Sequence, residues 1–281
     1  MTAPDIFDRA ARRRRRDRVA DGYGAHAFLR DAMLEGLEDR LASVSRRFSD
    51  MLDLGCFDGA LAAPPGARIA RLDAGRRFAR VAGGVQGYED RLPFADASFD
   101  LVVSAGVLDQ VNDLPGALAL VKRCLRPDGL FLAAFVGGNS LGTLRACLRA
   151  AEPDRPAPRA HPMVDVRSAG DLLLRAGLAL PVADVETLTV RYGGLGGLFD
   201  DLRGMGASNL LTGRRALRRD VLARMADAFA GMAQADGRTP ERFDIVYLTA
   251  WAPSPDQPRP AARGSGRTPL ADALKRFPEK R

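Results

Sequence analysis

The chain has 281 residues, 46% hydrophobic and 27% charged, as in an ordinary globular protein of one large domain with additions. The formal net charge is +7, but no apolar run approaches the roughly 18–20 residues of a membrane span, and the N-terminus lacks the apolar core of a signal peptide. Three scattered cysteines without CxxC spacing and only two histidines argue against a disulfide framework and a metal site. We therefore expect a cytoplasmic protein without a resident metal.

The first 48 residues predict a helical region, divided by the breaker DGYG at 21–24. This region contains the densest basic run of the chain, RRRRR at 12–16. Such a run can bind nucleic acid or an anionic surface. Because no aromatic platform or RNA-binding motif accompanies it, we expect a solvated helix face and no nucleic-acid partner. Peripheral membrane association through the basic regions stays an open alternative.

Strands and helices alternate from residue 51. The expected strands are apolar runs, at 51–55, 67–73, 99–106 and 130–136. An amphipathic helix at 113–125, capped by Asp113, leads through a turn at 126–129 into the last of these strands. This alternation predicts an α/β fold with a mostly parallel sheet covered by helices on both faces.

The pattern is less regular after residue 138. Helices are expected at 140–152, 169–177 and 218–235, and strands at 182–192 and 241–253, the latter at the sheet edge. GGLGG at 193–197 lacks the Gly-Lys-Ser/Thr ending of a phosphate loop, so we expect a flexible loop and a candidate lid over the acceptor site. We divide the chain into a helical region (1–48), a cofactor-binding domain (49–252, with acceptor insertions at 138–240) and a poorly ordered basic tail (253–281).

The segment MLDLGCFDGAL at 51–61 predicts a strand, a glycine turn and a helix start, the arrangement that binds ligands in open α/β sheets. Asp53 ends the first strand and Asp73 the next, 18 residues beyond Gly55. An acid at this distance suits the hydroxyls of a ribose. The GxGxxG motif typical of NAD sites is absent, and two carboxylates suit the ammonium and sulfonium groups of S-adenosylmethionine (SAM). We therefore expect SAM as the cofactor.

The segment YEDRLPFADASFDLVVS at 88–104 adds an acidic pair before a buried strand. With the glycine turn and RPDGLFLA, it resembles the class I SAM-dependent methyltransferase fold. The resemblance implies a Rossmann-like, seven-stranded sheet and an acidic element beside the adenine. The residues expected to bind the cofactor are Asp53, Gly55, Cys56, Phe57, Gly59, Asp73, Ala74, Tyr88, Glu89 and Ser104.

Further segments resemble the complex I assembly-factor branch of methyltransferase-like proteins in mitochondria and alphaproteobacteria. They are IFDR, VNDLPGALALVKRCLRPDGLFLAAFVGGNSLGTLR, DDLRGMGASN, YLTAWAP and RPAARGS, spread over roughly residues 5–270. The resemblance implies an enzyme that modifies an arginine of an iron–sulfur subunit of complex I during assembly. The chain departs from the family pattern at four places, with Phe57 for the middle glycine, Tyr88 for an acid, Asp109-Gln110 for a His-Trp pair and Asn139 for an acid.

Phe57 decides whether the cofactor loop works. A positive φ at this position would strain a phenylalanine by about 1–2 kcal/mol, whereas at a negative φ its ring would wall the methionine end of the pocket. We expect a modified but working loop; a fold that has lost its ligand is the alternative.

Methyl transfer relies mainly on positioning, and a general base helps only where the acceptor must lose a proton. Asp109 and Tyr192 are the candidate catalytic residues. Hydroxylation would need oxygen activation, and the sequence contains no metal or flavin signature. Two alternatives to an enzyme acting on a protein side chain stay open. One is a non-catalytic assembly chaperone that binds an immature respiratory subunit, and the other is a small-molecule or carrier-protein methyltransferase.

Overall fold

The computed structural model describes residues 5–153 and 157–257. The strands are β1 (Asp50–Leu54), β2 (Arg68–Asp73), β3 (Val85–Gln86), β4 (Phe99–Ala105), β5 (Leu125–Gly137), β6 (Ala179–Tyr192) and β7 (Thr239–Trp251). The helices are α1 (Arg9–Val19), α2 (Phe28–Ala42), α3 (Arg76–Val81), α4 (Leu114–Cys124), α5 (Gly142–Ala151), α6 (Val166–Arg175), α7 (Leu195–Gly204) and α8 (Arg219–Ala230), with 3₁₀ turns η1 (Tyr23–His26) and η2 (Leu108–Gln110). No described helix is long and apolar enough to cross a membrane.

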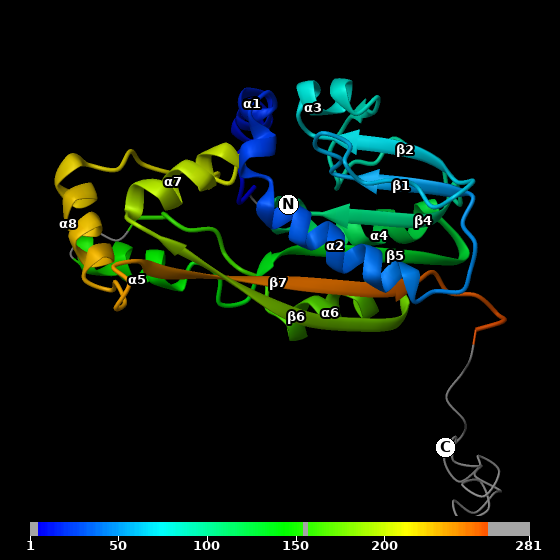
Figure 1. Ribbon diagram of the computed structural model, residues 1–281. Coiled ribbons are helices and arrows are strands. Elements are labelled where there is room, and N and C mark those ends of the chain that lie inside the picture. The colour runs from blue at the N-terminus through cyan, green and yellow to red at the C-terminus, as the bar shows by residue number, and fades with distance from the viewer. Residues whose placement is uncertain (1–4, 154–156, 258–281) are drawn as a thin grey trace, which may run out of the picture.

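The strands form one seven-stranded sheet in the order β3-β2-β1-β4-β5-β7-β6, in which β7 runs antiparallel to its neighbours (Figure 1). The predicted Rossmann-like, mostly parallel sheet is therefore confirmed. The chain leaves β1 toward one edge of the sheet and returns to β4 on the other side. The carboxyl ends of β1 and β4 thus flank the point where the strand order reverses, which is where ligands bind in such sheets.

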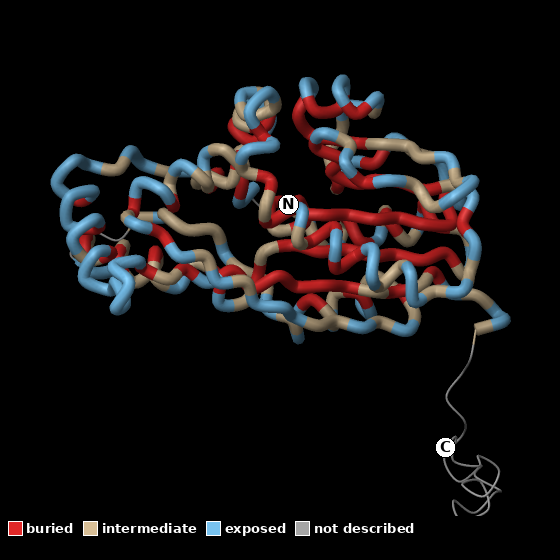
Figure 2. Tube along the Cα trace, viewed as in Figure 1, coloured by how far each residue is buried: buried red, intermediate tan, exposed pale blue. Residues whose placement is uncertain are grey.

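Helices cover both faces of this sheet; β4 is buried along its whole length, and β1 and β5 along most of theirs (Figure 2). On one face α2 packs against the sheet through Met33 and Leu37, next to Met51 of β1. On the other face α4 and α6 cover a second core that includes Leu52 and Leu54. The alternation of Met51 and Leu52 between two cores is the period of two expected for a strand buried on both sides.

A second lobe forms where β6 and β7 extend beyond the other strands (Figure 1). Helices α5, α7 and α8 pack there around a separate apolar core that includes Leu144, Leu198, Met225 and Phe229. This lobe is built from the sequence after residue 138, where the pattern of the chain is less regular. It lies beside the carboxyl ends of the parallel strands and so borders the cofactor loop.

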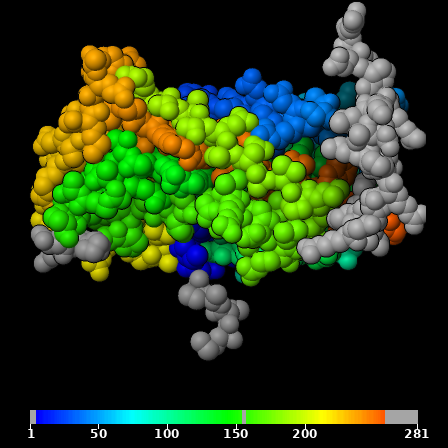
Figure 3. All heavy atoms as spheres, turned by 90° about the horizontal axis from the view of Figure 1, so that it is seen from below, coloured from blue at the N-terminus to red at the C-terminus, as the bar shows by residue number. Residues whose placement is uncertain are grey.

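The sheet edge is β6 rather than β7. Seen from below, α2 lies beside β6, and Arg40 of α2 donates to Asp184 and to Glu186 of β6 (Figure 3). The segment 241–253, expected at the edge, pairs instead with β5 on one side and β6 on the other. The prediction was wrong because an apolar, β-branched strand suits an interior position as well as an edge.

Two local predictions also need correction. Three of the five residues of GGLGG belong to α7 rather than to a loop, because Leu195 and Leu198 are buried at helical spacing and hold Gly196 and Gly197 in the first turn. The turn expected at 126–129 lies inside the span of β5, where Asp128 adopts φ +61°. The tail expected to be poorly ordered lies outside the described residues from 258 onward.

Candidate functional site

The loop after β1 is a tight glycine turn. Gly55 has φ +86°, and a Cβ there would lie 2.4 Å from a methyl carbon of Val107. Gly59 has φ +80°. Phe57 lies between them at φ +48°, the left-handed region that costs a non-glycine residue about 1–2 kcal/mol. Position 57 therefore does require the conformation that favours glycine.

The ring of Phe57 is buried in an aromatic cluster that offsets this strain. It stacks on Tyr23 with ring centroids 4.8 Å apart, and its centroid lies 5.4 Å from that of the Phe78 ring. The guanidinium carbons of Arg16 and Arg30 lie 3.8 Å and 4.8 Å from the ring centroid. Each aromatic or cation–π contact of this kind contributes about 0.5–2 kcal/mol. The side chain thus holds the loop in the conformation that its backbone disfavours.

Asp53 is a buried carboxylate with no hydrogen-bond partner among the described residues. Its nearest cation is Arg71, whose Nε lies 3.8 Å from Oδ2. Burial raises the pKa of Asp53 to about 7, against the effect of Arg30 and Arg71. A buried polar group without a partner requires an explanation, and a cationic ligand at the end of β1 would supply one.

Asp73 ends β2, as predicted, and both of its carboxylate oxygens are occupied. Oδ1 accepts from the N–H of Gly75 at 2.7 Å and from Nε of Arg16 at 2.8 Å. Oδ2 accepts from the N–H of Phe57 at 3.0 Å and from Nη2 of Arg16. The carboxylate expected to bind a ribose is thus paired with a side chain of α1.

The acidic pair is also paired with α1. Glu89 is buried and accepts two hydrogen bonds from Arg12, at 2.6 Å and 2.7 Å. Asp90 accepts two from Arg9, at 2.6 Å and 2.7 Å, and the guanidinium of Arg9 lies 5.4 Å from the ring centroid of Tyr88. The solvated face expected for RRRRR is therefore wrong for Arg12 and Arg16, which are buried.

The remaining predicted cofactor residues are buried around the loop. The hydroxyl of Ser104 donates to the carbonyl of Leu54 at 2.9 Å and so joins β4 to β1. Ala74, which follows Asp73 in the chain, is buried. Cys56 is buried as well, and desolvation raises the pKa of its thiol to about 12. Contacts of these three residues with a cofactor stay predictions.

An inner cavity of about 80 Å³ lies beside the ring of Phe57. Asp109 and Gln110 line it, together with Gly106, which follows β4. Burial raises the pKa of Asp109 to about 6, opposed by a hydrogen bond from Gln110. Asp109 therefore lies at the inner cavity, and its catalytic role stays a prediction.

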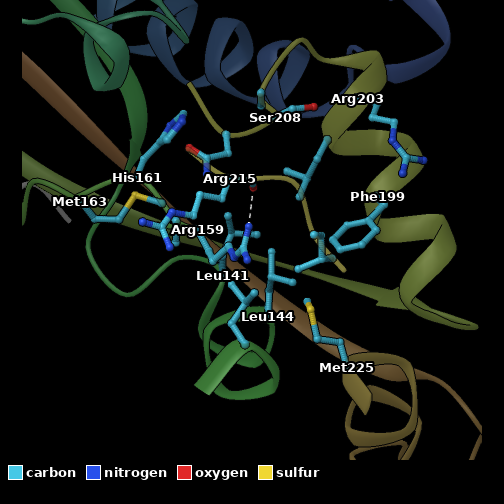
Figure 4. A pocket seen from close by; sticks show the side chains of 16 residues that line it. Leu141, Leu144, Arg159, His161, Met163, Phe199, Arg203, Ser208, Arg215 and Met225 are labelled. Carbon is cyan, nitrogen blue, oxygen red and sulfur yellow. Dashed lines mark hydrogen bonds between the residues drawn. The ribbon is translucent and has the colours of Figure 1, made fainter. Parts of the chain in front are cut away.

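An outer cavity of about 250 Å³ continues outward from the inner one, between α5, α7 and α8 of the second lobe (Figure 4). Its walls are largely apolar, and three arginines also line it, Arg159, Arg203 and Arg215. Five residues line both cavities, Leu141, His161, Met163, Leu202 and Ala207. The two cavities are therefore neighbours that share these five residues, and they lie between the second lobe and the loop after β1.

Tyr192, the other catalytic candidate, lines neither of these two cavities. It is buried in the core of the second lobe, and desolvation raises its pKa. The sequence analysis missed Arg12, Arg16 and His161. Arg12 and Arg16 lie four residues apart on one helix face, but Arg14 and Arg18 have the same spacing, so the local pattern does not single them out.

The residue types at the ends of β1 and β2 suit SAM. An unpartnered carboxylate at Asp53, glycines of positive φ at Gly55 and Gly59, and Asp73 at the end of β2 are the expected set. In this structure Asp73 and Glu89 are hydrogen-bonded to arginines of α1. Fold and site together define a class I methyltransferase-like protein.

The comparisons agree with this class. The family described as "Methyltransferase domain" matches residues 52–133. The crystal structure of YcgJ from Bacillus subtilis superposes with a TM-score of 0.57 at 16% identity, over 78% of this chain and 99% of its own. A SAM-dependent methyltransferase from Thermotoga maritima gives a TM-score of 0.51 at 14% identity, over 85% of this chain and 99% of its own. The comparisons support SAM as the cofactor.

Two full-length relatives define the family more closely. The mitochondrial arginine-hydroxylase NDUFAF5 of Danio rerio is 34% identical, over 96% of this chain and 90% of its own. A malonyl-[acyl-carrier protein] O-methyltransferase of Methylovorus is 31% identical, over 92% of this chain and 98% of its own. The chain belongs to the methyltransferase-like family that contains the NDUFAF5 arginine-hydroxylases, the complex I assembly-factor branch predicted from the sequence.

Proposed function

We propose that the chain binds SAM at the ends of β1 and β2 and modifies a protein side chain that enters through the outer cavity. The observation that carries this proposal is the adjacency of two cavities, one in the second lobe and one lined by Asp109 and Phe57, which share five lining residues. The relatives named arginine-hydroxylases favour an arginine as the acceptor. A subunit of complex I is the partner that the resemblance to the assembly-factor branch implies.

Asp109 is the residue best suited to hold such an acceptor. It lines the inner cavity, and with a pKa of about 6 its carboxyl group is mostly ionised at neutral pH. An ionised carboxylate can pair with an incoming guanidinium and orient it. SAM supplies an electrophilic methyl group when bound, and Asp109 can accept the proton that a methylated nitrogen releases.

Calorimetric titration of the purified chain with SAM and S-adenosylhomocysteine tests the cofactor. Binding that is lost in Asp53→Asn would support it. The acceptor is tested by incubating the chain with the iron–sulfur subunits of complex I and measuring the mass of their peptides. A mass gain of one CH₂ group indicates methylation and a gain of one oxygen atom indicates hydroxylation.

A variant that fills the outer cavity separates the two sites. Leu148→Trp adds bulk to the cavity wall, so it should keep cofactor binding and lose modification of the acceptor. Leu222→Trp, on the exposed side of α8, is the matched control and should keep both. Full modification by Leu148→Trp would contradict the outer cavity as the acceptor path.

A carrier-protein methyltransferase is the second candidate. The described residues that line the outer cavity include three arginines and no acidic side chain, which suits an anionic acceptor. The malonyl-[acyl-carrier protein] relative has this kind of substrate in its name. Methylation of a malonyl carrier protein, with no change in complex I peptides, would favour this candidate.

A non-catalytic assembly chaperone is the third candidate. It is favoured by the pairing of Asp73 and Glu89 with arginines of the same chain. Capture of an immature subunit without any mass change, together with absence of SAM binding, would favour it. A cytoplasmic location and peripheral attachment to a membrane stay predictions.

A further inference from the structure

Helix α1 occupies the polar positions of the cofactor site. Arg16 and Arg12 make two hydrogen bonds each, to Asp73 and to Glu89, and the side chains of both arginines are at most 4% exposed. These are the carboxylates predicted for the ribose and for the element beside the adenine. Figure 1 shows α1 standing next to α3, which follows β2. The contacts join segments 57 and 77 residues apart in the chain.

The carboxylate of Asp73 has no acceptor capacity left for a ribose. A carboxylate offers about four lone-pair sites, and here four donor groups fill them, two from Arg16 and two from the backbone at Phe57 and Gly75. Ribose hydroxyls that bind Asp73 must therefore displace Arg16. Its guanidinium also lies over the ring of Phe57, so it takes space as well as hydrogen bonds.

The space left at the loop leads to the same conclusion. The inner cavity measures about 80 Å³, whereas sites for ligands of this size measure about 300–1,000 Å³. Tyr23, Phe57 and Arg30 line it, and the guanidinium carbon of Arg30 lies 4.8 Å from the ring centroid of Phe57. A nucleoside-sized ligand requires α1 or its arginines to move away.

Helix α1 is bonded to the wall of the outer cavity as well. The N–H of Asp8 donates to the carbonyl of Leu210 at 2.8 Å, and the N–H of Thr212 donates to the carbonyl of Ile6 at 2.9 Å. Arg15 donates to the carbonyl of Ser208, a residue that lines the outer cavity. A movement of α1 therefore removes support from the segment 207–212.

We propose that α1 is a displaceable intramolecular occupant of the cofactor site, and that its release couples cofactor binding to opening of the acceptor cavity. This inference rests on the proposed binding of SAM. Arg16 holds Asp73 until the ribose replaces it, and the departing helix frees the segment 207–212 for an acceptor. The loop at Phe57 is then neither defective nor a relic, because the ring of Phe57 is the surface on which the guanidinium of Arg16 packs.

The energetics permit such a displacement. Burying an ion pair costs nearly as much solvation as the pairing returns, so release of Arg16 and Arg12 into water is inexpensive once Asp73 and Glu89 gain new partners. A free helix of eleven residues is marginal in water, so released α1 would lose much of its structure. Couplings between sites typically change affinity by about 5- to 150-fold.

The test compares Arg16→Gln with Arg13→Gln in the full chain. Both variants remove one positive charge from α1, but Arg13 is exposed and Arg16 is buried on Asp73. Titration with S-adenosylhomocysteine should show binding at least about fivefold tighter for Arg16→Gln than for wild type, and unchanged for Arg13→Gln. Weaker or equal binding by Arg16→Gln would overturn the inference and leave the proposed cofactor intact.

A second variant leaves every carboxylate contact in place. Phe7→Ala removes an anchor of α1 that packs on Leu210 and Leu211, away from the loop. It should also tighten binding of S-adenosylhomocysteine, because α1 is then easier to displace. This variant keeps the inference testable if Arg16→Gln fails to fold, as circular dichroism would reveal.

Hydrogen exchange on the wild-type chain gives a readout without any substitution. Adding S-adenosylhomocysteine should increase exchange in α1 and in the segment 207–212 while it protects residues 53–59. Protection of α1 would overturn the inference, because the helix would then be a clamp on the ligand. Absence of binding by the wild type and by both variants would overturn the inference and the proposed cofactor together.

Discussion

The strain at Phe57 can be measured by comparing alanine and glycine at this position. Phe57→Ala and Phe57→Gly both remove a side chain that is 4% exposed, and both should lower the free energy of unfolding by about 3–5 kcal/mol. This shared loss cancels when the two variants are compared with each other. What remains is the difference between alanine and glycine at φ +48°.

The two contributions to that difference have opposite signs. Alanine retains the left-handed strain of about 1–2 kcal/mol, which glycine relieves. Glycine loses about 0.5–1 kcal/mol more conformational entropy on folding. We therefore expect the free energy of unfolding of Phe57→Gly to equal that of Phe57→Ala or to exceed it by up to about 1.5 kcal/mol. At a position without left-handed strain, the alanine variant would be the more stable of the two.

Urea unfolding of both variants provides the measurement, with a matched control in α8. Ala223 is an exposed helical position, so Ala223→Gly should cost about 1 kcal/mol. If Phe57→Gly is less stable than Phe57→Ala by this same amount, position 57 carries no left-handed strain and the reasoning is refuted.

Three further predictions concern buried groups. Because burial raises the pKa of Asp53 from about 4 in the unfolded chain to about 7, its ionisation destabilises the fold as pH rises through this window. Asp53→Asn should therefore increase the free energy of unfolding at about pH 8, by on the order of 4 kcal/mol at most, and change little at about pH 4; an equal effect at both would contradict this. For His161, burial and nearby arginines lower the pKa to about 4, so its contribution to stability is present above about pH 6.5 and lost as pH falls toward 4. An NMR titration should show its imidazole neutral at about pH 5.5, and titration near pH 6.5 would argue against its burial. A Cβ at Gly36 of α2 would lie 2.4 Å from the hydroxyl of Tyr247, so Gly36→Ala should lower the melting temperature although alanine favours helix by about 1 kcal/mol. In α7, Gly196→Ala meets no described atom within 4 Å and should raise the melting temperature; equal shifts in both helices would exclude the clash.

The sequence by itself determined the parallel architecture and the place of the two acids at the strand ends. The helix start predicted after the glycine turn was wrong, because the described residues between β1 and β2 form no helix. Apolar runs of strand length alternating with amphipathic helices predict a parallel sheet, because each element buries its own face locally. Asp53, Asp73 and the glycines of the loop are close in sequence to the strand ends that position them, so their place needs no long-range information. The position of Asp109 at the cavity follows in the same way from the end of β4.

Only the tertiary structure decided what those carboxylates touch. RRRRR has the composition of a solvated helix face, and nothing in its local pattern shows that Arg12 and Arg16 turn inward to Glu89 and Asp73. The interior position of β7, the helix at GGLGG and the neighbouring cavities beside the second lobe were also undetermined. Each of these features depends on contacts between segments that are distant in the chain. Packing and the burial of charge decide which of several compatible surfaces meet, and local propensity does not.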